Sequence, residues 1–144
     1  MQRINELRFV FNYQSEDCLP NSPTNEPSTL NFVTGVKLLA YHYRSDFVLF
    51  QLEERPPPNF NVFYNGWSKE DENPKDGALI HHPRTDIKKI SRYTGEAKKD
   101  QLFPANQKYW KVKWSSGTSE DGSSGAPFYN NEKLVCGQQS NNDK

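Results

Sequence analysis

Short hydrophobic runs alternate along this chain with prolines, glycines and polar loops, and no stretch shows the period of a long helix. Runs rich in β-branched and aromatic residues between such breaks are typical of β-strands. The pattern predicts strands at 7–13, 32–40, 47–52, 60–67, 78–83, 87–93 and 108–114, followed by a hairpin at 128–136. We therefore expect an all-β protein.

Three of these segments carry more detailed expectations. The uninterrupted apolar run at 47–52 is of the kind that is buried on both faces of a sheet. Alternation in 108–114 places Trp110, Val112 and Trp114 on one face, where a core role is favoured over a ligand platform. In the hairpin, Asn130-Asn131 is expected to supply the positive-φ residues of a tight turn.

Composition and charge narrow the class of protein. A length of 144 residues suits one ordinary domain, and ten prolines and eight glycines fit many short strands joined by loops. Eighteen basic and eighteen acidic residues cancel, so charge gives no basis for a nucleic-acid or anionic-membrane partner. No run is long enough to span a membrane, and the N-terminus lacks the apolar core of a secretory signal.

The loop Gly122-Ser123-Ser124-Gly125 is the strongest candidate for chemistry. A serine hydroxyl is a weak nucleophile, so it needs a neighbouring base and backbone N–H groups that meet the oxyanion of a tetrahedral intermediate. Flanking glycines allow the amides of Gly122 and Ser124 to point into one pocket, with the Ser124 hydroxyl at its mouth. A polar surface turn would explain the same four residues without any chemistry.

Asp46 directly precedes the apolar run at 47–52. A carboxylate at the mouth of a buried strand is costly unless it is hydrogen-bonded. It could accept an N–H from a catalytic imidazole, or it could cap the turn that enters the strand.

The histidines and cysteines do not suggest a metal centre. His81 and His82 are adjacent strand residues and point to opposite faces, and no Cys or His cluster completes a site around them. Cys18 lies in a polar, proline-rich loop, whereas Cys136 lies in an apolar strand, where a buried free thiol is the default. We expect no cofactor and no bound metal.

Several motifs together resemble a known family. The segment 122–127, followed by a hairpin and Gly137-Gln138, resembles the nucleophile loop of trypsin-like serine proteases, most closely of the bacterial lysyl endopeptidases. The segments 11–18, 45–49 and 80–83 with 89–91 resemble successive stretches of the same family in the same order. The resemblance covers nearly all of residues 8–140.

The resemblance implies a double six-stranded β-barrel, incomplete at both ends. Residues 1–55 would form the second part of barrel one, 56–58 the link, 59–139 most of barrel two, and 140–144 a disordered tail. It also implies a secreted, monomeric serine endopeptidase acting on peptides or proteins through an acyl-enzyme, with lysine as the candidate specificity. Ser124 would be the nucleophile, Asp46 the residue that orients the histidine, and the Gly122 and Ser124 amides the oxyanion hole.

The chain also departs from the family pattern. The family's catalytic histidine lies in a Thr-Ala-x-His-Cys-like stretch that this sequence lacks, and neither His42 nor the His81-His82 pair matches that position. Ser123 stands where chymotrypsin-like enzymes have the aspartate that pairs with a newly freed N-terminus, although lysyl endopeptidases also have a serine there. Glu120 matches a glutamate that the family has near the site.

These departures lead to two expectations. The first is that the chain is an internal piece of a protease and is inactive by itself, and that neither Cys18 nor Cys136 forms a disulfide. The alternative is a catalytically inert β-rich module that binds peptide or carbohydrate through Tyr64, Trp67 and Trp110.

Overall fold

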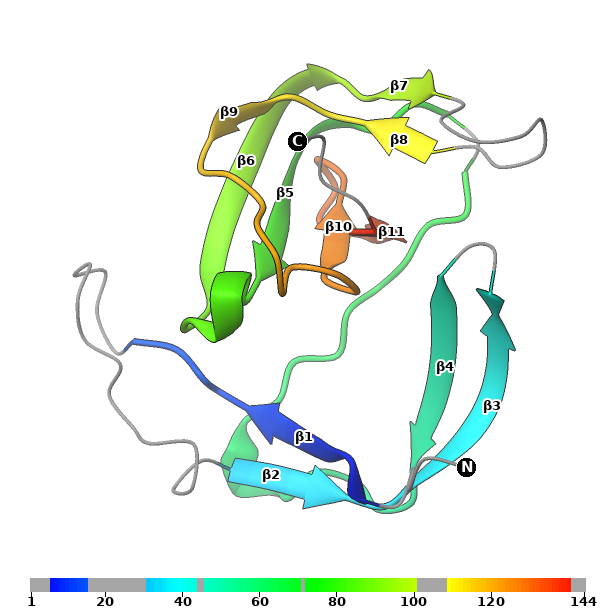
Figure 1. Cartoon of the computed structure of the whole chain (residues 1–144), viewed down its shortest axis with the longest axis vertical. Helices are drawn as coiled ribbons and strands as arrows, with labels where there is room; N and C mark the ends of the chain where they lie inside the picture. Colours follow the sequence, from blue (N-terminus) through cyan, green and yellow to red (C-terminus); the bar gives the residue numbers. More distant parts are fainter. Residues whose placement is uncertain (1–5, 16–30, 44–45, 71, 101–108, 141–144) are drawn as a thin grey trace. The chain divides into compact units, whose positions relative to one another are not determined.

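The computed structural model describes residues 6–15, 31–43, 46–70, 72–100 and 109–140 (Figure 1). Its regular elements are β-strands and two single turns of 3₁₀ helix, so the all-β prediction is confirmed. The chain divides into two compact units, Met1–Tyr64 and Asn65–Lys144. No helix in the described part of the chain is long and apolar enough to cross a membrane.

The first unit contains two antiparallel strand pairs. Strand β1 (Arg8–Phe11) pairs with β2 (Asn31–Thr34), and β3 (Val36–His42) pairs with β4 (Phe47–Leu52). The single strand predicted at 32–40 is divided between β2 and β3 at Gly35, which has a φ of +81°. That left-handed conformation interrupts an extended strand and is easily adopted only by glycine.

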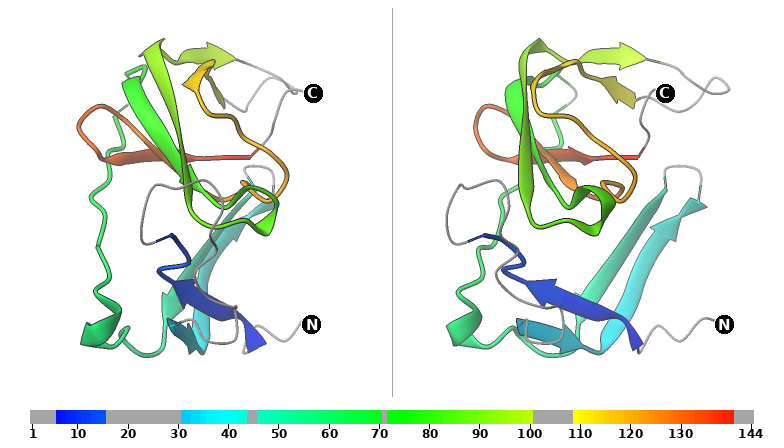
Figure 2. Two further views of the ribbon diagram at one scale, coloured as in Figure 1. Left: turned by 90° about the vertical axis from the view of Figure 1, so that its left-hand side faces the viewer. Right: turned by 60° about the vertical axis from the view of Figure 1, so that its left-hand side comes forward.

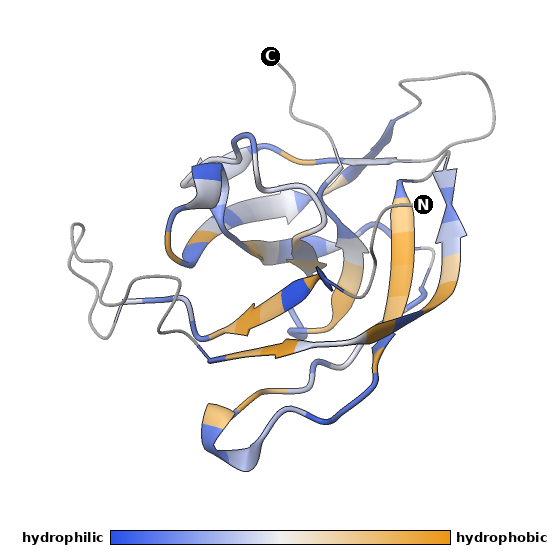
Figure 3. Ribbon diagram, turned by 60° about the horizontal axis from the view of Figure 1, so that its bottom comes forward, coloured by the Kyte–Doolittle hydropathy of each residue, from blue (hydrophilic) through white to orange (hydrophobic). Residues whose placement is uncertain are grey.

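Residues 47–52 are an apolar run of the kind that is buried on both faces of a sheet, but they are largely exposed in the unit as described. Phe47, Val48 and Leu49 are between 38% and 51% exposed. Among the described residues β4 pairs only with β3, and a two-stranded ribbon cannot cover both of its own faces. Figure 3 shows this pair as largely hydrophobic ribbon.

The strand predicted at 60–67 is wrong. Pro58–Phe60 instead forms a 3₁₀ turn, and the segment contributes only an isolated bridge between Trp67 and Val135. Pro58 has the fixed φ that favours the start of a helical turn. Phe60 is buried against Phe11, with ring centroids 5.7 Å apart, and its carbonyl accepts a 2.6 Å hydrogen bond from Asn12 Nδ2.

The second unit is organised around a five-stranded antiparallel sheet. Its order is β11 (Val135–Gln138), β10 (Pro127–Tyr129), β5 (Lys75–His81), β6 (Lys89–Glu96) and β9 (Trp114–Ser116), and β7 (Lys98–Asp100) pairs separately with β8 (Tyr109–Lys111). In both views of Figure 2, β11 runs across the direction of β5 and β6, so the sheet is strongly coiled. No sheet closes into a barrel within the described residues.

An aromatic cluster fills the concave side of this sheet. Tyr93 stacks on Phe128 at 4.9 Å and meets Trp114 edge-on at 6.5 Å. Trp110 and Val112 pack against the same cluster, so the core role predicted for the alternating residues of 108–114 is confirmed.

The β10–β11 turn differs from its prediction. Neither Asn130 nor Asn131 has a positive φ; Lys133 has one, at +64°. The Asn130 side chain instead accepts hydrogen bonds from the amides of Glu132 and Leu134, at 3.1 and 3.0 Å. Asparagine thus organises this longer turn through its side-chain oxygen and not through its backbone conformation.

Candidate functional site

The predicted nucleophile loop connects β9 to β10 and places its two serines oppositely. The side chain of Ser123 is fully buried, whereas Ser124 is exposed. Two backbone hydrogen bonds fix this arrangement, one from the Ser123 amide to the Glu120 carbonyl at 3.0 Å and one from Ala126 to the Ser123 carbonyl at 3.1 Å. Ser124 is therefore the serine that a substrate could reach.

Gly122 occupies a position that demands glycine. Its φ is +89°, and a Cβ atom there would lie 3.1 Å from the Arg84 amide nitrogen and 3.3 Å from the His82 carbonyl oxygen. Within the described residues, neither the Gly122 amide nor the Ser124 amide has a hydrogen-bond acceptor. Both N–H groups that were predicted to form an oxyanion hole therefore have no acceptor in the part of the chain that the structure describes.

The loop is tied to its surroundings at both ends. The Arg84 amide donates to the Asp121 carbonyl at 2.7 Å, and the Arg84 guanidinium lies 3.4 Å from the Glu120 carboxylate at the surface. At the other end, the Gly125 amide donates to the Gln139 carbonyl at 2.7 Å. Glu120 thus contributes an ion pair to the loop.

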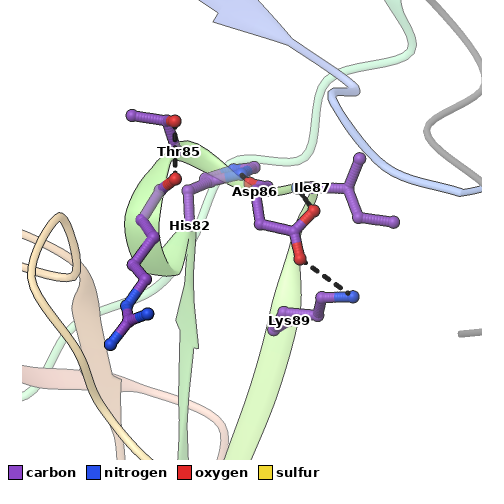
Figure 4. A network of polar contacts seen from close by, with 6 residues as sticks. His82, Thr85, Asp86, Ile87 and Lys89 are labelled. Carbon is purple, nitrogen blue, oxygen red and sulfur yellow. Dashed lines mark hydrogen bonds and ion pairs between the residues drawn. The ribbon is translucent and has the colours of Figure 1, made fainter. Parts of the chain in front are cut away.

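The loop is bonded to the 3₁₀ turn Pro83–Thr85, which lies between β5 and β6. Polar contacts hold this turn and the residues around it (Figure 4). The His82 Nδ1–H donates to the Asp86 carbonyl at 3.0 Å. The Asp86 carboxylate accepts from the Ile87 amide at 2.7 Å and lies 3.4 Å from Lys89 Nζ. These contacts, the Ile87 amide first, hold the pKa of Asp86 below its ordinary value.

His81 is a further component of the site. It is 2% exposed, at the end of β5, with Nδ1 2.8 Å from Ser123 Oγ and Nε2 3.2 Å from Ser91 Oγ. Burial lowers the pKa of His81, the nearby His82 lowers it further, and Glu120 opposes the shift. Its ring is therefore buried against the loop, whereas His82 is only partly buried.

No role was predicted for His81, although the sequence holds part of the signal. Leu79 is fully buried on β5, and the two-residue period of a strand places His81 on the same face. What the period does not give is the partner, because Ser123 lies 42 residues further along the chain.

Asp46 lies in the turn between β3 and β4 of the first unit. It is exposed, has a φ of +50°, and donates its amide to the Tyr43 carbonyl at 3.3 Å. Aspartate tolerates this left-handed conformation better than most residues. The structure brings Gly122, Ser124 and His81 together in the second unit, and Asp46 belongs to the other unit.

A cavity of about 260 Å³ borders the loop within the second unit. Trp110, Trp114 and Phe128 supply its apolar wall, and Thr118 and Gln139 supply polar groups. Thr118 belongs to the loop segment that leads to Ser124. The cavity therefore combines an apolar wall with polar groups, as ligand pockets commonly do, although Ser124 itself does not line it.

The cysteine predictions are only partly covered. Cys136 is a free, half-buried thiol, and burial raises its pKa. Cys18 lies outside the described residues. Among the described residues, no group of three or more His, Cys, Asp or Glu side chains is arranged to hold a metal ion.

Comparison with known proteins agrees with the sequence motifs. A family model described as "Lysyl endopeptidase, C-terminal domain" matches residues 1–141. The lysyl endopeptidase of Pseudomonas aeruginosa is 31% identical over 121 residues, which cover 83% of this chain and 26% of that protein. The chain thus spans about a quarter of the length of this relative.

Proposed function

Since this chain belongs to the lysyl endopeptidase C-terminal domain family, we propose that it forms part of a serine endopeptidase with Ser124 as its nucleophile. The observation that carries the proposal is the opposite placement of two adjacent serines. Ser123 is buried and hydrogen-bonded, and Ser124 is exposed next to two amides that have no acceptor among the described residues. An accessible hydroxyl and oxyanion donors are two of the components that acyl transfer requires, and the third is a base.

The reaction follows from these components. Ser124 Oγ attacks the carbonyl carbon of the scissile peptide bond, and its proton passes to a base. The Gly122 and Ser124 amides donate to the oxyanion that forms, which stabilises the tetrahedral intermediate. Collapse of that intermediate breaks the C–N bond, the base protonates the leaving amine, and water then hydrolyses the acyl-enzyme by the same steps.

The base is proposed to be an imidazole supplied by a part of the protein outside these 144 residues. His81 cannot take this role, since its ring is buried and its Nδ1 faces Ser123, not Ser124. Asp46 is proposed to accept the N–H of the incoming imidazole and fix its tautomer. Asp46 lies at an exposed position in the β3–β4 turn.

The substrate is proposed to be a peptide or protein, cleaved after lysine as the name of the Pseudomonas aeruginosa relative indicates. The whole protein is proposed to act as a secreted monomer, without cofactor, nucleic-acid or membrane partner. Exposed Ser124 and the neighbouring cavity suit an extended peptide chain that reaches the loop from solvent.

Hydrolysis of a lysyl ester by the full-length protein tests this proposal. The Ser124→Ala variant is expected to lower kcat by about 10³-fold or more, because only oxyanion and binding contributions would remain. Ser116→Ala, at another exposed serine in the second unit, is the matched control and should leave kcat unchanged. Equal loss in both variants, or no loss in Ser124→Ala, would refute Ser124 as the nucleophile.

The alternative function, an inert binding module, is favoured by one observation. Tyr64 and Trp67 are 74% and 71% exposed, and exposed aromatic rings are common anchors for peptides and sugars. Trp110 does not share this exposure, since it packs against the core cluster. If the full-length protein hydrolyses no lysyl ester but binds peptides or oligosaccharides, with affinity lost in Trp67→Ala, this alternative is correct.

A further inference from the structure

We propose that His81 is the positioning residue of the nucleophile loop, and that its neutral ring, bonded to Ser123 on one side and Ser91 on the other, sets the orientation of the Gly122 and Ser124 amides. The catalytic consequence rests on the proposed function of Ser124. The structural part, a single His81 tautomer that holds the loop, stands by itself.

The hydrogen-bond directions in this network are fixed by counting protons. The Ser91 hydroxyl donates its one proton to the Thr118 carbonyl at 2.6 Å. Ser91 Oγ must therefore accept from His81, which places the ring proton on Nε2. His81 Nδ1 is then a lone-pair acceptor, and it accepts the hydroxyl proton of Ser123 at 2.8 Å.

The chain of hydrogen bonds continues into the loop on both sides. Ser123 Oγ accepts a hydrogen bond from the Glu120 amide at 3.2 Å, while the Thr118 carbonyl lies at the opposite end. One ring thereby connects β5, β6 and two points of the 118–123 segment. Each hydrogen bond of this side-chain network therefore has only one possible donor and one possible acceptor. No buried side-chain N or O atom in the described residues lacks a partner.

The loop is thereby fixed where its geometry matters most. Ser123 lies between Gly122 and Ser124, so anchoring its side chain restrains the stretch of backbone that carries both N–H groups, the Ser124 N–H in the Ser123–Ser124 peptide and the Gly122 N–H in the peptide before Gly122. An oxyanion hole is effective only when its donors are preorganised at hydrogen-bonding distance from the developing charge. Loss of the His81 bond would remove this anchor and allow the backbone of 122–124, with its two amides, to shift.

The surroundings favour the neutral ring that this network requires. A second proton would sit on Nδ1, opposite the Ser123 hydroxyl, and the Ser123 proton would lose its acceptor. Burial and His82 both lower the pKa of His81, and Glu120 alone raises it. The Arg84 guanidinium lies 3.4 Å from the Glu120 carboxylate, and its positive charge offsets part of the effect of Glu120 on the ring.

The catalytic consequence is tested by the rate at which a fluorophosphonate labels Ser124 in the full-length protein. His81→Leu removes both ring contacts at similar volume, and Ser123→Ala removes the other partner. Each is expected to label about 100-fold more slowly, since small displacements of catalytic groups have effects of this size. His81→Asn, whose side-chain oxygen can take the place of Nδ1, should recover most of the rate, and Thr94→Ala, at an exposed position of β6, is the control.

The rate must be separated from folding. The final labelled fraction reports how much protein is folded, whereas the rate constant reports the geometry of the folded site. A merely structural role would lower the fraction and leave the rate constant unchanged. A rate constant within about twofold of wild type in both His81→Leu and Ser123→Ala, or no recovery in His81→Asn, would overturn the proposal.

A second measurement decides the matter if the wild-type protein is not labelled at all, which would refute the proposed function and not the network. Long-range ¹H–¹⁵N spectra distinguish the histidine tautomers. We expect His81 to carry its proton on Nε2 at pH 7, and Ser123→Ala to increase hydrogen exchange of the 120–125 amides. A proton on Nδ1, a cationic ring, or unchanged exchange in Ser123→Ala would refute the network.

Discussion

Two adjacent histidines show how strongly position decides the chemistry of a residue. His81 is buried and accepts a hydrogen bond from the Ser123 hydroxyl, whereas His82 donates one to the Asp86 carbonyl in the turn that follows. The neutral form of His81 is part of the folded structure, because each ring nitrogen already has a defined partner. The stability of the protein should therefore depend on pH through this one ring.

The sign of that dependence follows from the lowered pKa of His81. In the unfolded chain its imidazole takes up a proton near the ordinary value of 6.5, and in the folded protein only at lower pH. Between those two values the unfolded state binds more protons, so lowering the pH favours unfolding. The His81 contribution is complete above about pH 6.5 and is lost progressively as the pH falls through the folded pKa.

Urea unfolding of the full-length protein between pH 5 and pH 8, compared with His81→Asn, measures this effect. The difference in unfolding free energy between the two proteins should shrink as the pH falls below the ordinary histidine value. Thr94→Ala, which removes no titratable group and lies at an exposed position of β6, is the control and should follow the wild-type profile. A difference that grows toward low pH would contradict the neutral ring.

The glycines of the loop offer a second prediction at this scale. Gly122 and Gly125 both have left-handed φ values, but only Gly122 has protein atoms close to the position of an added Cβ. Gly125→Ala should cost roughly 1–2 kcal/mol of unfolding free energy from backbone strain alone. Gly122→Ala should cost more, and Gly137→Ala, at an ordinary φ, should cost least. Chemical denaturation of the three variants would contradict this if Gly122→Ala were the mildest.

At the scale of elements, the strands were predictable where alternation and local breaks coincide. Strands β5 and β6 lie close to their predicted ranges, and the alternating residues of 108–114 form core as expected. The predicted strand at 60–67 failed because Pro58 and Phe60 make a local turn that the aromatic alternation does not reveal. His81 was missed for a different reason, since its partner Ser123 is brought near only by the fold.

The β10–β11 turn gives a test at this scale. Asn130→Ala removes the acceptor of two backbone amides, those of Glu132 and Leu134, and should lower the unfolding free energy by about 1 kcal/mol. Asn131→Ala is the matched control, since its side chain has no hydrogen bond to another described residue. Equal effects of the two substitutions on thermal unfolding would show that the Asn130 side chain does not organise the turn.

At the scale of the whole molecule, the family resemblance recognised from ordered motifs is confirmed. The roles of Ser124, Gly122 and Asp46 remain predictions, and the two units that carry them are separate in sequence. Hydrophobic periodicity could predict strands but not which strand pairs cover each other. The exposed face of β4 is the clearest example, because an apolar sequence of this kind is usually buried on both faces of a sheet.

That exposed face predicts aggregation of the 144-residue chain by itself. Phe47–Leu52 is uncharged and rich in β-formers, and exposed strands of this kind pair with other chains. Val48→Lys should raise the soluble fraction after expression, because it places a charge on the exposed apolar surface. Gln51→Lys adds the same charge on the same strand without removing an apolar side chain, and should help less. Equal solubility of the two variants would count against β4 as the cause.

The central claim is that Ser124, not its buried neighbour, is the reactive serine. Reaction of the full-length protein with a fluorophosphonate, followed by peptide mass spectrometry, locates the adduct on a single residue. Ser124 is exposed, and the Gly122 and Ser124 amides have no acceptor among the described residues. We therefore expect the adduct on Ser124 and its disappearance in Ser124→Ala. An adduct on Ser123 or on a serine outside the loop, or none in the folded protein, would contradict this account.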